Sequence, residues 1–153
     1  MGTQISEVLD MAMVSIQDYK LNNLYNITPN DHTAWENYLY GFLNLAIADF
    51  DNCNQSLDYD INTGVFVSVL TAQEKLIISR WIVYEWFVRE VNNVTQFNVT
   101  LTDNDYKHFS EAQNLQAKME YRDRQREIVM QMMVDYEKNS IDYKEWANGN
   151  FGI

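Results

Sequence analysis

The chain has 153 residues, a formal net charge of −11 at pH 7 and a hydrophobic fraction of 46%, a combination that fits one domain with a core of its own. No run of 18 apolar residues occurs and the first residues lack the regions of a signal peptide, so we expect neither a membrane span nor secretion. The single cysteine, Cys53, excludes an intrachain disulfide and a cysteine-based zinc site. One proline and five glycines leave few helix breakers, which favours long helices.

The charge is unevenly distributed along the chain. Residues 1–70 carry nine acids and one base, Lys20, whereas residues 71–153 carry thirteen acids and ten bases. An acidic first half disfavours nonspecific binding to phosphates and is compatible with association with other protein surfaces.

Two amphipathic helices are predicted first. Apolar residues recur every three or four positions over residues 3–19, with Thr3 as the N-cap. After a loop around Pro29, a second helix is predicted from Asp31 or His32 to Cys53, with Cys53 on its apolar face. Gly41 inside this helix costs about 1 kcal/mol relative to alanine, which predicts close packing of a neighbouring element there.

Residues 54–70 are predicted to form a small hairpin or an extended loop, because the turn signal Asn62-Thr63-Gly64 separates two β-prone runs. Thr71 and Glu74 then form a capping box that starts a third helix. This helix is apolar nearly all round, which predicts a central position in the fold. We expect it to end at Asn92-Asn93 and to be followed by a weak strand at 94–101.

The last helix is predicted to start near residues 102–105 and to run to about residue 138, either straight or with a bend near Ser110. A helix of about 36 residues would be about 54 Å long, which exceeds the diameter of a globule of this size. Part of it must therefore project, bend or pack on another chain. The remaining residues, 139–153, carry large apolar side chains that a tail docking on a neighbouring subunit would use, so we divide the chain into a helical domain, 1–138, and a tail.

Candidate sites for chemistry are weak. His108 and Glu111 are three residues apart on a predicted helix, but carboxylate di-iron bundles need two Glu-x-x-His motifs and further glutamates. Cys53 has no basic neighbour in sequence that would activate its thiol. We therefore predict no catalytic residue, cofactor or metal ligand.

A basic run, Lys118 to Arg126, is interleaved with acids and lacks an aromatic row for base stacking. Such interlaced charge favours a solvated or subunit-facing helix over a helix that contacts DNA.

The order of several short patterns resembles the head–tail connector (adaptor or neck) proteins of tailed bacteriophages. The resemblance covers residues 14–138 and rests on Ile16-x-Asp18-Tyr19-x-Leu21-x-x-Leu24, Ala46-Ile47-x-x-Phe50-x-x-Cys53-x-x-x-Leu57, Gly64-x-Phe66-x-x-x-Leu70-Thr71-x-x-Glu74, Tyr84-Glu85-Trp86, Asp105-Tyr106-Lys107-x-Phe109-Ser110-x-Ala112-x-x-Leu115 and Asp135-Tyr136.

The resemblance implies a non-enzymatic subunit of the virion neck, assembled in the host cytoplasm. Members of that family are small and mainly helical, and form rings, commonly dodecameric, beneath the portal protein. There they extend the DNA channel, through which DNA passes without specific binding, and present a platform for a tail-side neck protein.

We therefore expect a mainly α fold: a four-helix bundle with a long C-terminal helix, a small β-hairpin or extended insertion, and an extended C-terminal tail. Segments 57–70 and 92–101 are candidate ring or tail-side contacts, and residues 106–153 are the expected contacts with neighbours or the portal. The interface residues predicted within the last range are Tyr121, Arg122, Arg126, Met132, Tyr136, Tyr143, Trp146 and Phe151. The alternatives are a cytosolic helical protein–protein adaptor unrelated to phage and a small metal-dependent enzyme around His108 and Glu111.

Overall fold

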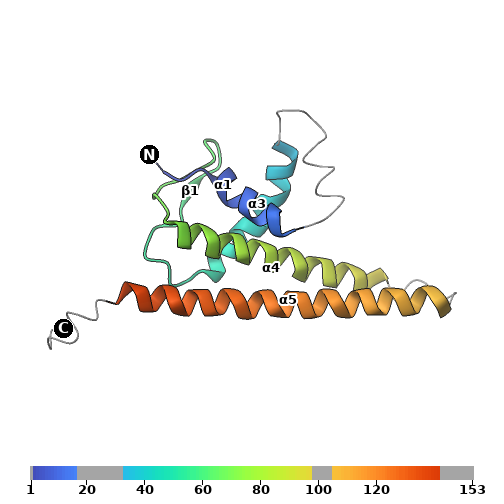
Figure 1. The fold of residues 1–153 in the computed structure, drawn as a ribbon. Helices are drawn as coiled ribbons and strands as arrows, with labels where there is room; N and C mark the ends of the chain where they lie inside the picture. Colours follow the sequence, from blue (N-terminus) through green and yellow to red (C-terminus); the bar gives the residue numbers. More distant parts are fainter. Residues whose placement is uncertain (1, 17–32, 98–104, 142–153) are drawn as a thin grey trace.

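The computed structural model describes residues 2–16, 33–97 and 105–141. The described part of the chain holds four helices and one antiparallel pair of short strands (Figure 1). In chain order these are α1 (Ile5–Ser15), α3 (Thr33–Asp49), β1 (Tyr59–Asp60), β2 (Val65–Phe66), α4 (Ala72–Phe97) and α5 (Asp105–Ser140). The predicted mainly helical fold, with a long last helix and a small β-hairpin, is confirmed.

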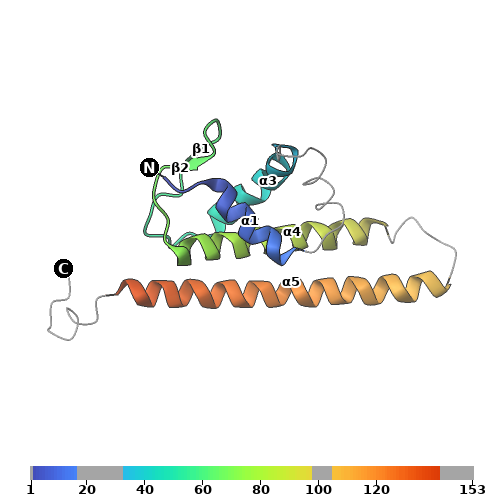
Figure 2. The ribbon, with the colours of Figure 1, turned by 45° about the horizontal axis from the view of Figure 1, so that its top comes forward.

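Helix α4 lies at the centre of the molecule. Helices α1 and α3 pack against one side of it, and α5 runs antiparallel along the other (Figures 1 and 2). Because α4 has neighbours on both sides, side chains from most of its circumference are buried, including Ile77, Ile78, Trp81, Ile82 and Trp86. The apolar residues around nearly the whole predicted helix indicated this position.

The predicted capping box starts α4. The Thr71 backbone N–H donates to Glu74 Oε2 at 2.7 Å, and the Glu74 N–H donates to Thr71 Oγ1 at 3.2 Å. The predicted end of this helix is wrong, because α4 continues past Asn92-Asn93 to Phe97. Val91 is buried and Glu90 pairs with Lys118 of α5 at 3.7 Å, so packing against α5 outweighs the low helix propensity of asparagine.

The strand predicted at 94–101 is also wrong where the structure describes it, because residues 94–97 are helical. Residues 98–101 lie outside the described residues.

The chain start joins the hairpin. In β1 and β2, Tyr59 pairs with Phe66, and Gly64 makes the turn with a φ of 66°, a backbone conformation that favours glycine. Phe66 donates its N–H to the Thr3 carbonyl at 2.8 Å, and Thr3 Oγ1 accepts from the Leu70 N–H at 2.8 Å. Thr3 is therefore not the predicted N-cap of α1. Gln4 holds that position without a side-chain cap, because the threonine hydroxyl is used by the segment that follows the hairpin.

Two expectations for the second helix are corrected. Helix α3 ends at Asp49, so Cys53 lies in the following loop, partly buried against the core, and not on the helix. An added Cβ at Gly41 would meet no atom within 4 Å, so no neighbouring element packs closely there. The proposed N-cap residue Asp31 lies outside the described residues.

Helix α5 is one uninterrupted helix without the bend considered near Ser110. Its 36 residues correspond to about 54 Å, and it extends past both ends of α4 (Figures 1 and 2).

A buried polar link joins the N-terminus of α4 to the C-terminal half of α5. The Tyr136 hydroxyl donates to Glu74 Oε1 at 2.6 Å and accepts from the Asn54 N–H at 2.9 Å. Glu74 is only 2% exposed, and its other oxygen serves the capping box. Burial, followed by the hydrogen bond to Glu74, raises the pKa of the Tyr136 hydroxyl above its usual range. The phenol therefore stays protonated and keeps donating to Glu74.

We predict that Tyr136→Phe lowers the free energy of unfolding by about 1–3 kcal/mol, because it leaves a buried carboxylate oxygen and a backbone N–H without this partner. Urea denaturation followed by circular dichroism measures the change. Tyr121→Phe is the matched control: Tyr121 is 37% exposed, so we expect a change within about 0.5 kcal/mol. Equal losses in the two variants would contradict the role of the link.

Candidate interaction surfaces

The predicted interface residues in the middle of α5 lie at or near the surface. Tyr121 is 37% exposed and packs one side of its ring on Phe87 of α4, with 4.6 Å between the ring centroids. Arg122 is half-buried and pairs with Asp123 on its own helix at 2.8 Å. Arg126 is exposed. The structure thus places Tyr121 and Arg126 where a second molecule has access to them.

The two predicted interface residues nearer the end of α5 face inward. Tyr136 is buried, with its ring 5.3 Å from that of Phe50, and Met132 is partly buried against the core. Both contribute to the packing of this chain. The last three, Tyr143, Trp146 and Phe151, lie outside the described residues.

A second set of apolar side chains, on and directly after α5, points to solvent. Met130 and Val134 are each 42% exposed, and their spacing of four residues places them on one face of the helix; Ile141, the residue directly after the helix, is 47% exposed. We call these three residues the outer row. The buried face of the same helix includes Val129 and Met133.

Sequence reasoning missed the outer row because both faces have apolar residues at helical spacing. Only the position of α4 shows which face is covered.

Bases are unevenly placed in the described part of the chain. The described residues up to Glu74 include eight acids and no lysine or arginine, whereas α4 and α5 carry all nine bases of the described residues. One link between the two groups is the ion pair of Lys75 with Glu7, at 2.9 Å. The elements α1, α3 and the hairpin are therefore acidic, with Lys75 and Arg89 of α4 directed toward them. Helix α5 carries most of the described bases, six, together with seven acids.

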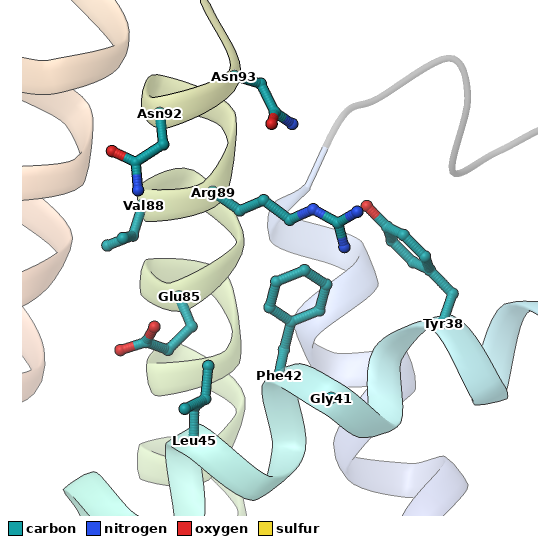
Figure 3. Close-up of a pocket in the computed structure, with 9 residues that line it drawn as sticks. All are labelled: Tyr38, Gly41, Phe42, Leu45, Glu85, Val88, Arg89, Asn92 and Asn93. Atoms are coloured by element: carbon teal, nitrogen blue, oxygen red, sulfur yellow. The ribbon is translucent and has the colours of Figure 1, made fainter. Parts of the chain in front are cut away.

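A groove of about 390 Å³ lies between α3 and the C-terminal half of α4. We call it the α3–α4 groove (Figure 3). Phe42, Leu45 and Val88 give it apolar walls, and Arg89 and Asn92 provide polar groups. Leu45 is 50% exposed, and the bare backbone at Gly41 leaves the groove open at that point.

Two charged side chains define the polarity of the groove. The Arg89 guanidinium lies 5.3 Å from the centroid of the Tyr38 ring and 5.7 Å from that of Phe42, within the range of a cation–π interaction (Figure 3). Burial, and then a hydrogen bond to Asp49 and the charge of that carboxylate, raise the pKa of Glu85 to about 7. The two carboxyl groups thus hold one proton between them well above the pH at which a free glutamate ionises.

The described part of the chain shows no metal site or activated nucleophile among the other candidate groups. Among these residues there is no group of three or more His, Cys, Asp or Glu side chains that would hold a metal ion. Burial is the main cause that raises the pKa of the Cys53 thiol, the opposite of what activates a nucleophile. The side chains of His108 and Glu111, and all of His32, lie outside what the structure describes. No described helix is long and apolar enough to cross a membrane.

Comparison with known proteins does not identify the chain: no family model, no curated protein and no solved structure matches it.

We predict that Glu85→Gln stabilises the protein at pH 8 and not at pH 4. The folded chain holds a proton on Glu85 up to about pH 7, whereas the unfolded chain releases it near pH 4.5. Stability therefore falls as the pH rises through this window, because folding then opposes ionisation. Glutamine stays neutral and can still donate to Asp49, so its melting temperature should exceed that of the wild type at pH 8 and match it at pH 4.

Thermal melts at several pH values test this expectation, with the exposed Glu127→Gln as control. A difference between Glu85→Gln and wild type that does not change with pH would contradict it.

Proposed function

We propose that this chain is a structural subunit of a head–tail connector ring of a tailed phage. In this role it binds the portal protein above and a tail-side neck protein below, and extends the DNA channel between them. The observation that carries the proposal is the long helix α5, which extends past both ends of α4 and exposes the outer row on the face away from it.

The outer row favours a partner protein over solvent. Its members Met130 and Val134 lie on the C-terminal half of α5 and Ile141 directly follows the helix, and burying them in a contact would be favourable by about 25 cal/mol per Å² of apolar surface. Obligate interfaces between subunits are richer in apolar residues than transient ones.

The uneven placement of bases is compatible with a ring. In a ring each copy presents one face to the different face of the next copy. The two sides of this chain differ in this way: α1, α3 and the hairpin carry acids and no lysine or arginine, whereas α5 carries six bases interleaved with seven acids. The acidic side also suits the inner rim of a channel, where it would repel the phosphates of passing DNA.

We predict that Val134→Asp lowers assembly without unfolding the chain. The side chain is 42% exposed in one copy, so the free energy of unfolding should stay within about 0.5 kcal/mol, whereas a carboxylate buried in a contact should raise the concentration needed for assembly at least about tenfold. Light scattering coupled to size exclusion measures the mass of the wild-type and variant particles over a range of concentrations.

Val14→Asp is the control, because Val14 is 83% exposed on α1 and does not belong to the outer row. Rings in electron micrographs of the wild type, or a monomer that assembles on isolated portal, would support the connector. A stable complex with one host protein, and no ring, would favour the alternative of a cytosolic adaptor unrelated to phage.

A further inference from the structure

We infer that the α3–α4 groove receives the segment 142–153 of a neighbouring copy, with Trp146 as its anchor. This inference rests on the self-assembly proposed above and names the contact that links one copy to the next.

The groove has the chemistry that an indole ring requires. Its walls are apolar, and it has no side chain at Gly41, so a large planar group has room beside the helix backbone. Arg89 lies over two aromatic rings at the edge, and a third aromatic ring would extend this stack (Figure 3). Asn92 and Asn93 provide amide oxygens that accept hydrogen bonds, as an indole N–H requires. Its volume of about 390 Å³ lies within the range of ligand sites in proteins.

The charges of the segment complement those of the groove. Lys144 stands two residues before Trp146 and Glu145 directly before it. The carboxyl groups of Glu85 and Asp49 share a proton, and the Lys144 ammonium group would take the place of that proton. The Arg89 guanidinium would pair with the Glu145 carboxylate. The segment has a positive and a negative side chain next to one large aromatic residue. The groove has a positive and a negative side chain next to an apolar wall, so the two are complementary.

The segment that occupies the groove must come from another copy. Phe87 and Glu90 of α4 contact Tyr121 and Lys118 of α5, which places the groove level with this part of α5. Ile141 follows Tyr121 by 20 residues, about 30 Å along the helix. Trp146 follows Ile141 by five residues, which span at most about 18 Å. The indole of one copy therefore falls short of its own groove, whose opening also lies on the side of α4 away from α5.

Disulfide trapping in the full-length chain tests the inference. In a Cys53→Ser background, Leu45→Cys places a thiol in the groove, and Ala147→Cys places one next to Trp146 without removing it. Under mild oxidation we expect a ladder of covalent dimers, trimers and larger multiples on non-reducing gels. Replacing Leu45→Cys by Ile61→Cys, at the exposed tip of the hairpin, is the matched control and should give at least tenfold less ladder.

Gly41 provides a variant that separates docking from folding. Gly41→Leu adds a side chain to the groove at a position where a Cβ meets no atom within 4 Å, and it removes a glycine from a helix, so it should raise the melting temperature while it lowers the yield of the ladder at least tenfold. Gly41→Ala is the control: it also removes the glycine but leaves most of the groove open, so the ladder should persist.

A cross-linked monomer in place of the ladder would overturn the inference, because the segment would then occupy the groove of its own chain. The absence of any cross-link, together with no binding of a labelled peptide of residues 142–153 to the full-length chain at millimolar concentration, would also overturn it. Rings that form without the cross-link would contradict this inference and leave the proposed function standing. A chain that binds the peptide but forms no ring, either by itself or on portal, would contradict the proposed function alone.

Discussion

The burial of α4 on both sides is the constraint on which the rest of the structure depends. A helix with apolar residues around most of its circumference is stable in water only if other elements cover it. Helices α1 and α3 cover one side and α5 covers the other, which leaves each of these three helices with a face directed outward. One such outward face carries the outer row of α5, and the α3–α4 groove opens where the cover of α4 is incomplete.

The polar contacts within this arrangement fix the position of α5 against α4. Glu74 caps its own helix with one carboxylate oxygen and accepts from Tyr136 with the other, and Trp81 donates its indole N–H to the Met133 sulfur at 3.2 Å. Directed bonds of this kind hold one register, whereas apolar contacts alone tolerate sliding. The register in turn places Ile141 at the end of the molecule remote from the groove.

The site is harder to predict than the fold because exposure depends on neighbours distant in sequence. Met132 and Met130 are two residues apart and both apolar, yet the first packs on the core and the second points to solvent. Tyr136 looks like an interface residue in sequence and lies inside the chain, since a hydroxyl at that position meets the buried Glu74. The groove has no sequence signal at all except Gly41, whose open surroundings are the reverse of the close packing that a helical glycine predicts.

The sequence by itself determined the helical class, the capping box at Thr71, the turn at Gly64 and the length of the last helix, because each depends on residues close together in the chain. Only the tertiary structure decided that α4 continues past Asn92-Asn93, that Thr3 bonds to Leu70 and does not cap α1, and which face of α5 remains open. The physical reason is the same in all three: the competing local preferences differ by about 1 kcal/mol or less, so contacts between distant segments determine the outcome.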